Sequence, residues 1–205
     1  MLRLILVRHG ETERNSVMRL QGGKSDVPLN EKGGKQAARL GYALKDEMLT
    51  AIYSSPLQRA LYTAGAIAGY HSLKVQTVDD LVEINMGAID GLNMVEIMAS
   101  HGQFWQRWHQ GDCSLELPGG GESLRRVQQR AWAAVQRIIR SHDETSVAIV
   151  SHSIVTQTVV LAALDSPLVA FPRFTPGVAS INILHIQNNF TTLKVLNDTC
   201  HLEGV

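Results

Sequence analysis

Short apolar runs recur along the chain and alternate with longer amphipathic segments. Strands that are covered on both faces typically appear as continuous apolar runs of about four to eight residues. The candidates before the C-terminal region are Leu2–Val7, Ala51–Tyr53, Leu73–Val78 and Val147–Val150. This pattern predicts several short strands buried at the centre of the fold.

The amphipathic segments between these runs predict helices. Asn30 can cap the first of them, because its side chain can accept a hydrogen bond from the free N–H groups of a helix start. Pro56 can take the first position of the second helix, where its missing N–H costs nothing. The predicted ranges are Glu31–Met48, Pro56–Ala68, Ser123–Arg140 (or from Glu122) and Ile154–Leu164. Residues 79–121 contain many glycines and predict a less regular region.

The alternation of strands and helices predicts an α/β fold: a three-layer α/β/α sandwich around a mainly parallel sheet. Two later strands, Ala179–Ile186 and Thr191–Leu196, predict a closing hairpin around Asn188 and Asn189. The chain has 205 residues, 44% of them hydrophobic, which suits one ordinary core. Repeats, low-complexity stretches and linkers are absent from the sequence, so we expect residues 1–205 to form a single domain.

The charge balance restricts the partners of the protein. The 19 basic and 19 acidic residues give a formal net charge of zero, so no general positive field attracts nucleic acid or an acidic membrane. The apolar N-terminal run is too short for a signal peptide, and no run has membrane-spanning length. Cys113 and Cys200 are expected to be reduced thiols. We therefore expect a cytoplasmic protein that binds a small anion locally.

Histidines and arginines follow the carboxyl ends of three predicted strands. Arg8 and His9 come directly after the first, Arg59 lies in the helix after the second, and His152 follows the run that ends at Val150. In open α/β sheets, ligands bind beyond the carboxyl ends of the strands. We therefore expect these side chains to meet at one rim.

Two arginines and two histidines at one rim suit a phosphoryl group. Guanidinium groups are costly to bury without an anion, and they match the oxygens of a phosphate. A histidine beside them can attack phosphorus while the arginines stabilise the transferring group. A dianionic phosphate would favour the protonated form of His152.

The order of these motifs resembles the histidine phosphatase superfamily, also called phosphoglycerate mutase-like, over nearly the whole chain. The matching segments are Leu6–Thr12 with Asn15 behind it, Leu20–Gly22, Asp26–Leu29, Tyr53–Ala60, Leu81–Ile84, the turn Pro118–Ser123, and Val150–His152. The resemblance implies a phosphomonoester hydrolase that needs no metal or other cofactor. Its partner would be a small phosphorylated metabolite.

The resemblance also implies a mechanism. His9 would attack phosphorus and form a phosphohistidine, and Glu83 would protonate the departing alkoxide and later deprotonate the attacking water. The phosphoryl oxygens would be held by Arg8, Arg59, Asn15 and His152. Gln21 and Gly22 would line the pocket, and His201, in a tail like that of metal-independent phosphoserine phosphatases, would lie near the substrate or only pack across the sheet edge.

Some residues depart from the family pattern or allow two interpretations. Ser153 stands where many relatives have glycine, and it can contact substrate or cap the following helix; we expect the cap. Ile89 and Asp90 replace an aromatic residue and a glutamate, which affects the substrate side of the pocket. Glu11 and Glu122 can act at the site or form a cap or a salt bridge. Trp105 and Trp108 can form a lid or, on a short helix, pack on the core.

The function itself has alternatives at this stage. Cofactor-dependent mutases of the family carry a long insertion between the acid and the second histidine, and residues 83–122 are short by comparison, which favours hydrolysis. A non-catalytic module that binds a phosphorylated ligand would not need both a nucleophile and an acid. Phosphoserine, phosphoglycerates, sugar phosphates and α-ribazole phosphate stay open as substrates, and a homodimer stays open as the assembly.

Overall fold

The structure is a computed structural model that describes residues 1–188 and 190–205. At its centre is a six-stranded sheet in the order β3-β2-β4-β1-β5-β6. The strands are β1 Leu2–Arg8, β2 Leu49–Ser54, β3 Val75–Thr77, β4 Ser146–Ser151, β5 Ile181–Gln187 and β6 Phe190–Asp198. The first four strands run parallel, and β5 and β6 are antiparallel to their neighbours. This confirms the predicted fold class.

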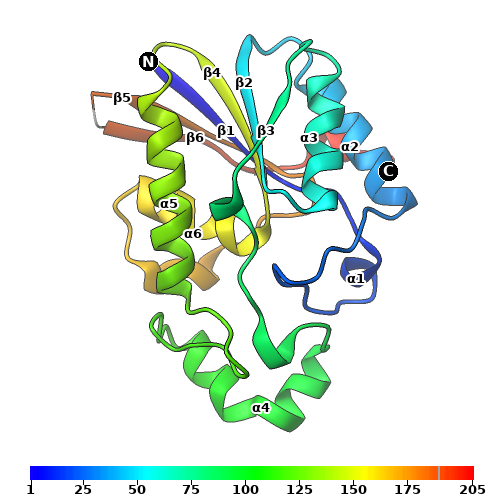
Figure 1. Ribbon diagram of the computed structural model, residues 1–205, viewed down its shortest axis with the longest axis vertical. Coiled ribbons are helices and arrows are strands. Elements are labelled where there is room, and N and C mark those ends of the chain that lie inside the picture. Colours follow the sequence, from blue (N-terminus) through cyan, green and yellow to red (C-terminus); the bar gives the residue numbers. More distant parts are fainter. Residues whose placement is uncertain (189) are drawn as a thin grey trace.

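Helices cover both faces of the sheet (Figure 1). The α-helices are α1 Glu13–Ser16, α2 Glu31–Ala43, α3 Gln58–Ala68, α4 Met94–His109, α5 Leu124–Arg140 and α6 Ser153–Ala163. Short 3-10 helices are η1 Asp79–Leu81, η2 Gly87–Ile89, η3 Leu168–Arg173 and η4 Cys200–Leu202. Helices α2 and α3 pack together, as do α5 and α6.

Alternate residues of β1 point to two separate cores. Leu4 and Leu6 join the core beneath α5 and α6, while Ile5 and Val7 join the core beneath α2 and α3. All four are at most 3% exposed. A strand covered on both faces needs an uninterrupted apolar run, which explains why the run is readable in the sequence.

The helix starts follow the predicted capping in two cases and depart from it in one. The Asn30 side chain accepts from the Gly33 amide at 2.7 Å, and Ser123 caps α5 in the same way. Pro56, however, is not helical: α3 begins at Gln58, because the Asp26 carboxylate accepts from the Gln58 amide at 2.8 Å and caps the helix there.

Three further element predictions were wrong in extent. Helix α2 ends at Ala43 instead of Met48, because the chain turns at Leu44 and Glu47 is held by the Arg3 side chain of β1. Strand β3 is shorter than predicted, with pairing to β2 limited to Val75–Thr77. Residues 79–121, predicted to be less regular, contain the 16-residue helix α4, which is longer than the short helix considered at the tryptophan pair. The predicted hairpin strands β5 and β6 do pair, but Asn189, named in the prediction of their turn, lies outside the described residues.

The position of Trp108 favours packing on the core, and not a lid, for the tryptophan pair Trp105 and Trp108. Its side chain is 3% exposed, stacks on Trp105 at 5.2 Å between ring centroids and meets the edge of Phe171 at 4.9 Å. The pair therefore packs α4 onto the core. None of the helices in the described residues combines the length and apolar character needed to cross a membrane.

Candidate active site

The carboxyl ends of β1, β4 and β2 meet at one rim of the sheet. Arg8 pairs with Ser151 in the parallel ladder, and Ser54 pairs with Val150. The contact continues beyond the strands, because the His9 amide donates to the Ser151 carbonyl at 3.0 Å. The residues that follow the three strands therefore lie side by side, as the sequence predicts.

His9 is held in a defined neutral tautomer. Its Nδ1 lies 2.7 Å from the carbonyl oxygen of Gly10, and a carbonyl can only accept, so Nδ1 carries the proton. The lone pair on Nε2 accepts from Arg59 Nε at 3.2 Å. Burial, followed by the charges of Arg59 and Arg8, lowers the pKa of His9 well below 6.5. The ring is therefore neutral at pH 7 and has a nucleophilic nitrogen.

His152 faces His9 with the opposite tautomer. Its Nδ1 accepts from Arg59 Nε at 3.3 Å, so Nε2 carries the proton and donates to Ser55 Oγ at 2.7 Å. The two imidazole centroids are 5.1 Å apart. Burial, and after it the Arg59 charge, lowers the pKa of His152 well below 6.5. We predicted a cationic His152 beside a phosphate. Burial and the Arg59 charge both disfavour that form, so a bound phosphate would have to outweigh them.

Arg59 joins the two histidines to a loop on the other side of the site. Its side chain is fully buried, and Nη1 donates to the Ser25 carbonyl at 2.7 Å while Nη2 donates to the Gly22 carbonyl at 3.3 Å. Burial lowers the pKa of Arg59 to about 10, so the guanidinium stays charged at neutral pH. A buried cation with neutral partners is a strong attractor for an anion.

Asp90 orders the loop that holds Arg59. Its carboxylate accepts from Ser25 Oγ at 2.6 Å, from Arg14 Nη1 at 2.7 Å and from the Gly22 amide at 3.3 Å. This residue was noted in the sequence as a departure from the family pattern. Its contacts tie it to the loop whose Ser25 and Gly22 carbonyls accept from Arg59.

Arg8 has unused hydrogen-bonding capacity at the same rim. Its Nη1 donates to the Pro176 carbonyl at 2.6 Å, and its Nε is buried without a hydrogen-bond partner among the described residues. Burial lowers the pKa of Arg8, and the Glu83 carboxylate acts in the opposite direction. Two arginines thus lie within electrostatic reach of one carboxylate.

Glu83 is a buried carboxylate held by two backbone amides. Oε1 accepts from the Ile84 amide at 2.9 Å, and Oε2 accepts from the Ile154 amide, in the first turn of α6, at 3.1 Å. The side chain is 5% exposed. Burial raises the pKa of Glu83 above its usual value, although the two amides oppose this. A carboxyl group whose buried surroundings favour its protonated form suits the donation of a proton.

Asn15 and Gln21 are grouped around the buried Thr12. Thr12 caps α1, and Asn15 Oδ1 accepts from the Thr12 amide at 3.1 Å. Gln21 Oε1 accepts from Thr12 Oγ1 at 2.8 Å, and Gln21 Nε2 is buried without a hydrogen-bond partner in the described part of the chain. Gly22, the next residue, contributes the carbonyl that meets Arg59. These candidates therefore lie on the side of the site formed by the loop whose Gly22 and Ser25 carbonyls accept from Arg59.

The predicted cap at Ser153 was wrong. Ser153 is the first residue of α6, its predecessor His152 occupies the cap position, and no side chain of that position caps the helix. The free amide of Ile154 is instead satisfied by Glu83. The acid and the helix therefore stabilise one another.

His201 lies in η4, which packs against α2. Both ring nitrogens are buried without a partner among the described residues, and burial lowers the pKa of the ring. The Asp198 charge and the backbone of Ala179 oppose that shift, and the Ala179 amide donates to the His9 carbonyl at 2.9 Å. His201 is thus close to the backbone of His9, and no hydrogen bond between described residues joins its side chain to the catalytic candidates.

Sequence reasoning did not assign roles to Ser55 and Arg130. Ser55 orients His152, and a serine directly after a strand that points to the rim was the available signal. Arg130 pairs with Glu122, which resolves that glutamate as a salt-bridge partner. Helix α5 carries five arginines, so nothing in the sequence distinguished Arg130 from the others.

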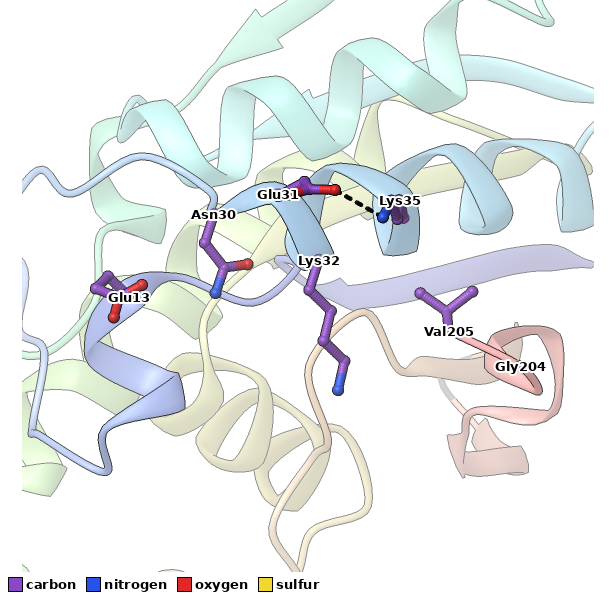
Figure 2. A pocket seen from close by; sticks show the side chains of 7 residues that line it. All are labelled: Glu13, Asn30, Glu31, Lys32, Lys35, Gly204 and Val205. Carbon is purple, nitrogen blue, oxygen red and sulfur yellow. Dashed lines mark hydrogen bonds and ion pairs between the residues drawn. The ribbon is translucent and has the colours of Figure 1, made fainter.

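A surface hollow beside the start of α2 is separate from these groups. Figure 2 shows it with Glu13, Asn30 and the ion pair of Glu31 and Lys35, and with Lys32 extending beside it. None of the histidines or the Glu83 carboxylate lines it. Within residues 1–188 and 190–205, no group of three or more His, Cys, Asp or Glu side chains could hold a metal ion.

Known proteins share both the sequence and the fold. The model of the histidine phosphatase superfamily (branch 1) matches residues 4–199. Phosphoserine phosphatase 1 of Hydrogenobacter thermophilus is 37% identical over 202 residues, which cover 98% of this chain and 95% of that protein. A phosphoserine phosphatase mutant from Entamoeba histolytica, solved with phosphoserine, has a TM-score of 0.90 and 27% identity, covering 98% of this chain and all of that chain.

A third relative binds a different anion. The mycobacterial glucosyl-3-phosphoglycerate phosphatase, solved with VO3, has a TM-score of 0.88 and 28% identity, over 96% of this chain and 99% of that chain. The sheet and the grouped histidines and arginines thus define an α/β phosphatase. The chain belongs to the histidine phosphatase superfamily, branch 1.

Proposed function

We propose that the chain hydrolyses phosphomonoesters of small metabolites through a phosphohistidine on His9. The observation that carries this proposal is the tautomer of His9: Nδ1 donates to the Gly10 carbonyl, and Nε2 presents its lone pair to the buried Arg59. A neutral imidazole beside two guanidinium groups is an activated nucleophile next to an anion site.

In the first step His9 Nε2 forms a bond to phosphorus and the bond from phosphorus to the ester oxygen breaks. The phosphoryl group then occupies the His9 Nε2 lone pair that had accepted from Arg59 Nε. The single Nε–H of Arg59, which His152 Nδ1 shares, can then donate to a phosphoryl oxygen. Arg8, whose buried Nε has no hydrogen-bond partner among the described residues, and Asn15 add donors to the same oxygens. The departing alkoxide takes the proton of Glu83, whose raised pKa favours the protonated form that this step requires.

In the second step water attacks phospho-His9. The Glu83 carboxylate takes a proton from the water, the bond between phosphorus and Nε2 breaks, and inorganic phosphate leaves. His9 returns to its neutral form and Glu83 to its protonated form, so the cycle closes. His152, held by Ser55, supplies a further N–H donor or a positive charge when it is protonated.

Phosphoserine is the first substrate to test. The sequence relative from Hydrogenobacter thermophilus and the structural relative from Entamoeba histolytica are both phosphoserine phosphatases. Phosphoglycerate esters come next, because the mycobacterial relative is a phosphatase of a glucosylated 3-phosphoglycerate. A panel of these esters and sugar phosphates, ranked by kcat/KM, identifies the preferred leaving group.

Phosphoryl transfer between two positions of a phosphoglycerate is the second candidate, since the fold and the nucleophile serve both reactions. The short segment from Glu83 to Glu122 favours hydrolysis. Release of inorganic phosphate from 3-phosphoglycerate, followed beside formation of 2-phosphoglycerate, decides between them. Isomer formation faster than phosphate release would contradict the hydrolase.

A chelator and two variants test the mechanism. We expect turnover of p-nitrophenyl phosphate to persist in excess EDTA and to disappear in His9→Ala. Glu83→Gln should accumulate an acid-labile phosphoenzyme with this substrate, because its stable leaving group departs without a proton while the second step still needs a base. Turnover that survives in His9→Ala, or is lost with EDTA, would overturn the proposal.

A further inference from the structure

Arg130, in the middle of α5, binds the backbone of the segment that carries Glu83. Its Nη1 lies 2.7 Å from both the Asp80 and the Val82 carbonyl oxygens, and its Nη2 lies 3.2 Å from the Glu83 carbonyl oxygen. The Arg130 side chain is 21% exposed. One guanidinium therefore supplies hydrogen bonds to three carbonyls within four residues of chain.

Glu122 fixes the other side of the Arg130 guanidinium. Arg130 Nε and Nη2 donate to its two carboxylate oxygens at 2.9 and 3.0 Å, which is a bidentate pair. Glu122 also accepts from the Asn85 amide at 2.9 Å, and its own amide donates to the Asn85 carbonyl at 2.9 Å. Although burial opposes it, the bonds from Arg130 and Asn85 lower the pKa of Glu122, so the pair stays ionised.

These contacts hold residues 80–85 on both sides of the acid. The Glu83 carbonyl is bound by Arg130, and the Ser151 hydroxyl donates to the Leu81 carbonyl at 2.8 Å. The carboxylate oxygens accept from the amide of Ile84, in the same segment, and from the amide of Ile154, in the first turn of α6. The position of the carboxyl group over the rim therefore depends on the backbone that Arg130 holds.

We propose that Arg130, ion-paired to Glu122, is a positioning residue for proton transfer by Glu83. This inference rests on the proposed function, in which Glu83 is the acid that protonates the leaving group. Neither side chain contacts His9. After burial and the nearer charges, the Arg130 charge also lowers the pKa of His152, but that effect is the same for every leaving group, whereas the effect through Glu83 depends on whether the leaving group needs a proton. Displacement of a catalytic group by about 1 Å can cost about a hundredfold in rate.

Two substrates separate this role from a purely structural one. A serine alkoxide needs a proton to leave, whereas p-nitrophenolate departs as a stable anion. For each variant we take kcat/KM on phosphoserine divided by kcat/KM on p-nitrophenyl phosphate. The fraction of correctly folded enzyme cancels in this ratio, so partial unfolding cannot imitate the effect.

We expect Arg130→Met to lower this ratio by about tenfold to a hundredfold, which is part of the roughly hundredfold to ten-thousandfold that general acid catalysis supplies, because the acid is displaced but still present. Arg130→Lys, which keeps the charge with fewer donors, should lower it less, and Glu122→Gln should lower it through loss of the ion pair. Arg140→Met is the matched control: Arg140 lies at the other end of the same helix, is exposed, and its side chain forms no hydrogen bond or ion pair among the described residues. Its ratio should stay at the wild-type value.

The double variant Arg130→Met with Glu83→Gln tests whether the two residues act together. If Arg130 acts through Glu83, its loss should not lower the ratio further once the acid is gone. A ratio in Glu83→Gln equal to that of wild type would overturn the acid role of Glu83 and thus the proposed function. A lowered ratio in Glu83→Gln with an unchanged ratio in Arg130→Met, or additive losses in the double variant, would overturn only the positioning role.

Discussion

Arg59 Nε lies 3.2 Å from His9 Nε2 and donates its proton to the lone pair of that nitrogen. The contact fixes the direction of the nucleophilic lone pair and places a positive charge beside it. A cation next to an imidazole disfavours a second positive charge on the ring. The arrangement therefore keeps the nucleophile unprotonated while it supplies the charge that binds the substrate.

Replacement of Arg59 by methionine should affect both rate and pH dependence. We expect kcat/KM for p-nitrophenyl phosphate to fall by about a hundredfold to a thousandfold, as when one strong donor to a transition state is removed. Because the Arg59 charge lowers the pKa of His9, its loss should move the acid limb of the kcat/KM profile to higher pH. Arg39→Met, an exposed arginine of α2, is the control. An acid limb at the wild-type position would contradict the electrostatic role.

The two buried imidazoles should make the fold sensitive to acid. Burial lowers the pKa of His9 and of His152 in the folded state, whereas both return to about 6.5 on unfolding. The unfolded chain therefore binds more protons below that pH, and stability falls as the pH drops below 6.5. The limiting slope is about 1.4 kcal/mol per pH unit for each histidine.

Urea unfolding between pH 8 and pH 5 measures this effect. We expect the free energy of unfolding of wild type to fall more steeply below pH 6.5 than that of a variant in which His9 and His152 are both asparagine. The remaining histidines are present in both proteins, so their contributions cancel in the comparison. Parallel curves for the two proteins would show that neither imidazole is held neutral by the fold.

The residues at the strand ends were predictable because the signal is local. A buried strand such as β1 must be apolar throughout, so the first charged residues after it, Arg8 and His9, mark the rim directly. Parallel pairing then brings the end of β4, with His152, beside them. Glu83 has no such signal in its own surroundings, and it was identified only through the resemblance to the family.

Features that depend on distant partners could not be predicted in this way. Helix α3 starts at Gln58 because Asp26, far away in sequence, caps it. The Ile154 amide is satisfied by Glu83 from another segment, which makes a cap by Ser153 unnecessary. Arg130 was overlooked because its partners are backbone carbonyls of residues 80–83, whose position depends on the whole fold.

Asp90→Asn should weaken anion binding although Asp90 is not one of the groups proposed to contact the anion. The substitution keeps the shape but removes the charge that binds Arg14 and the Ser25 hydroxyl, so the loop whose carbonyls hold Arg59 should loosen. We expect kcat/KM to fall by about tenfold and the inhibition constant of inorganic phosphate to rise in parallel. Asp143→Asn, at an exposed position, is the control. Unchanged phosphate inhibition in Asp90→Asn would refute the coupling of Asp90 to Arg59.

Alanine substitutions at two glycines near the acid segment, residues 80–85 with Glu83, can separate the cost of backbone strain from the cost of steric overlap. Gly87 and Gly120 both have positive φ, of 56° and 76°. A Cβ at Gly87 would overlap the Pro118 carbonyl oxygen and crowd the Gly121 amide, whereas a Cβ at Gly120 would have no neighbour within 4 Å. Gly120→Ala should therefore lower the free energy of unfolding only by the cost of the left-handed conformation, about 1–2 kcal/mol.

Gly87→Ala should cost that amount and a further 1–3 kcal/mol or so from overlap, because the acid segment and the turn at residues 117–121 must separate. Urea unfolding of the two variants measures both terms. Since Gly87 lies four residues after Glu83, we also expect Gly87→Ala to lower kcat/KM on phosphoserine more than on p-nitrophenyl phosphate, and Gly120→Ala to leave that ratio unchanged. Equal losses of stability in the two variants would show that the turn yields to the added methyl group and does not hold the acid segment in place.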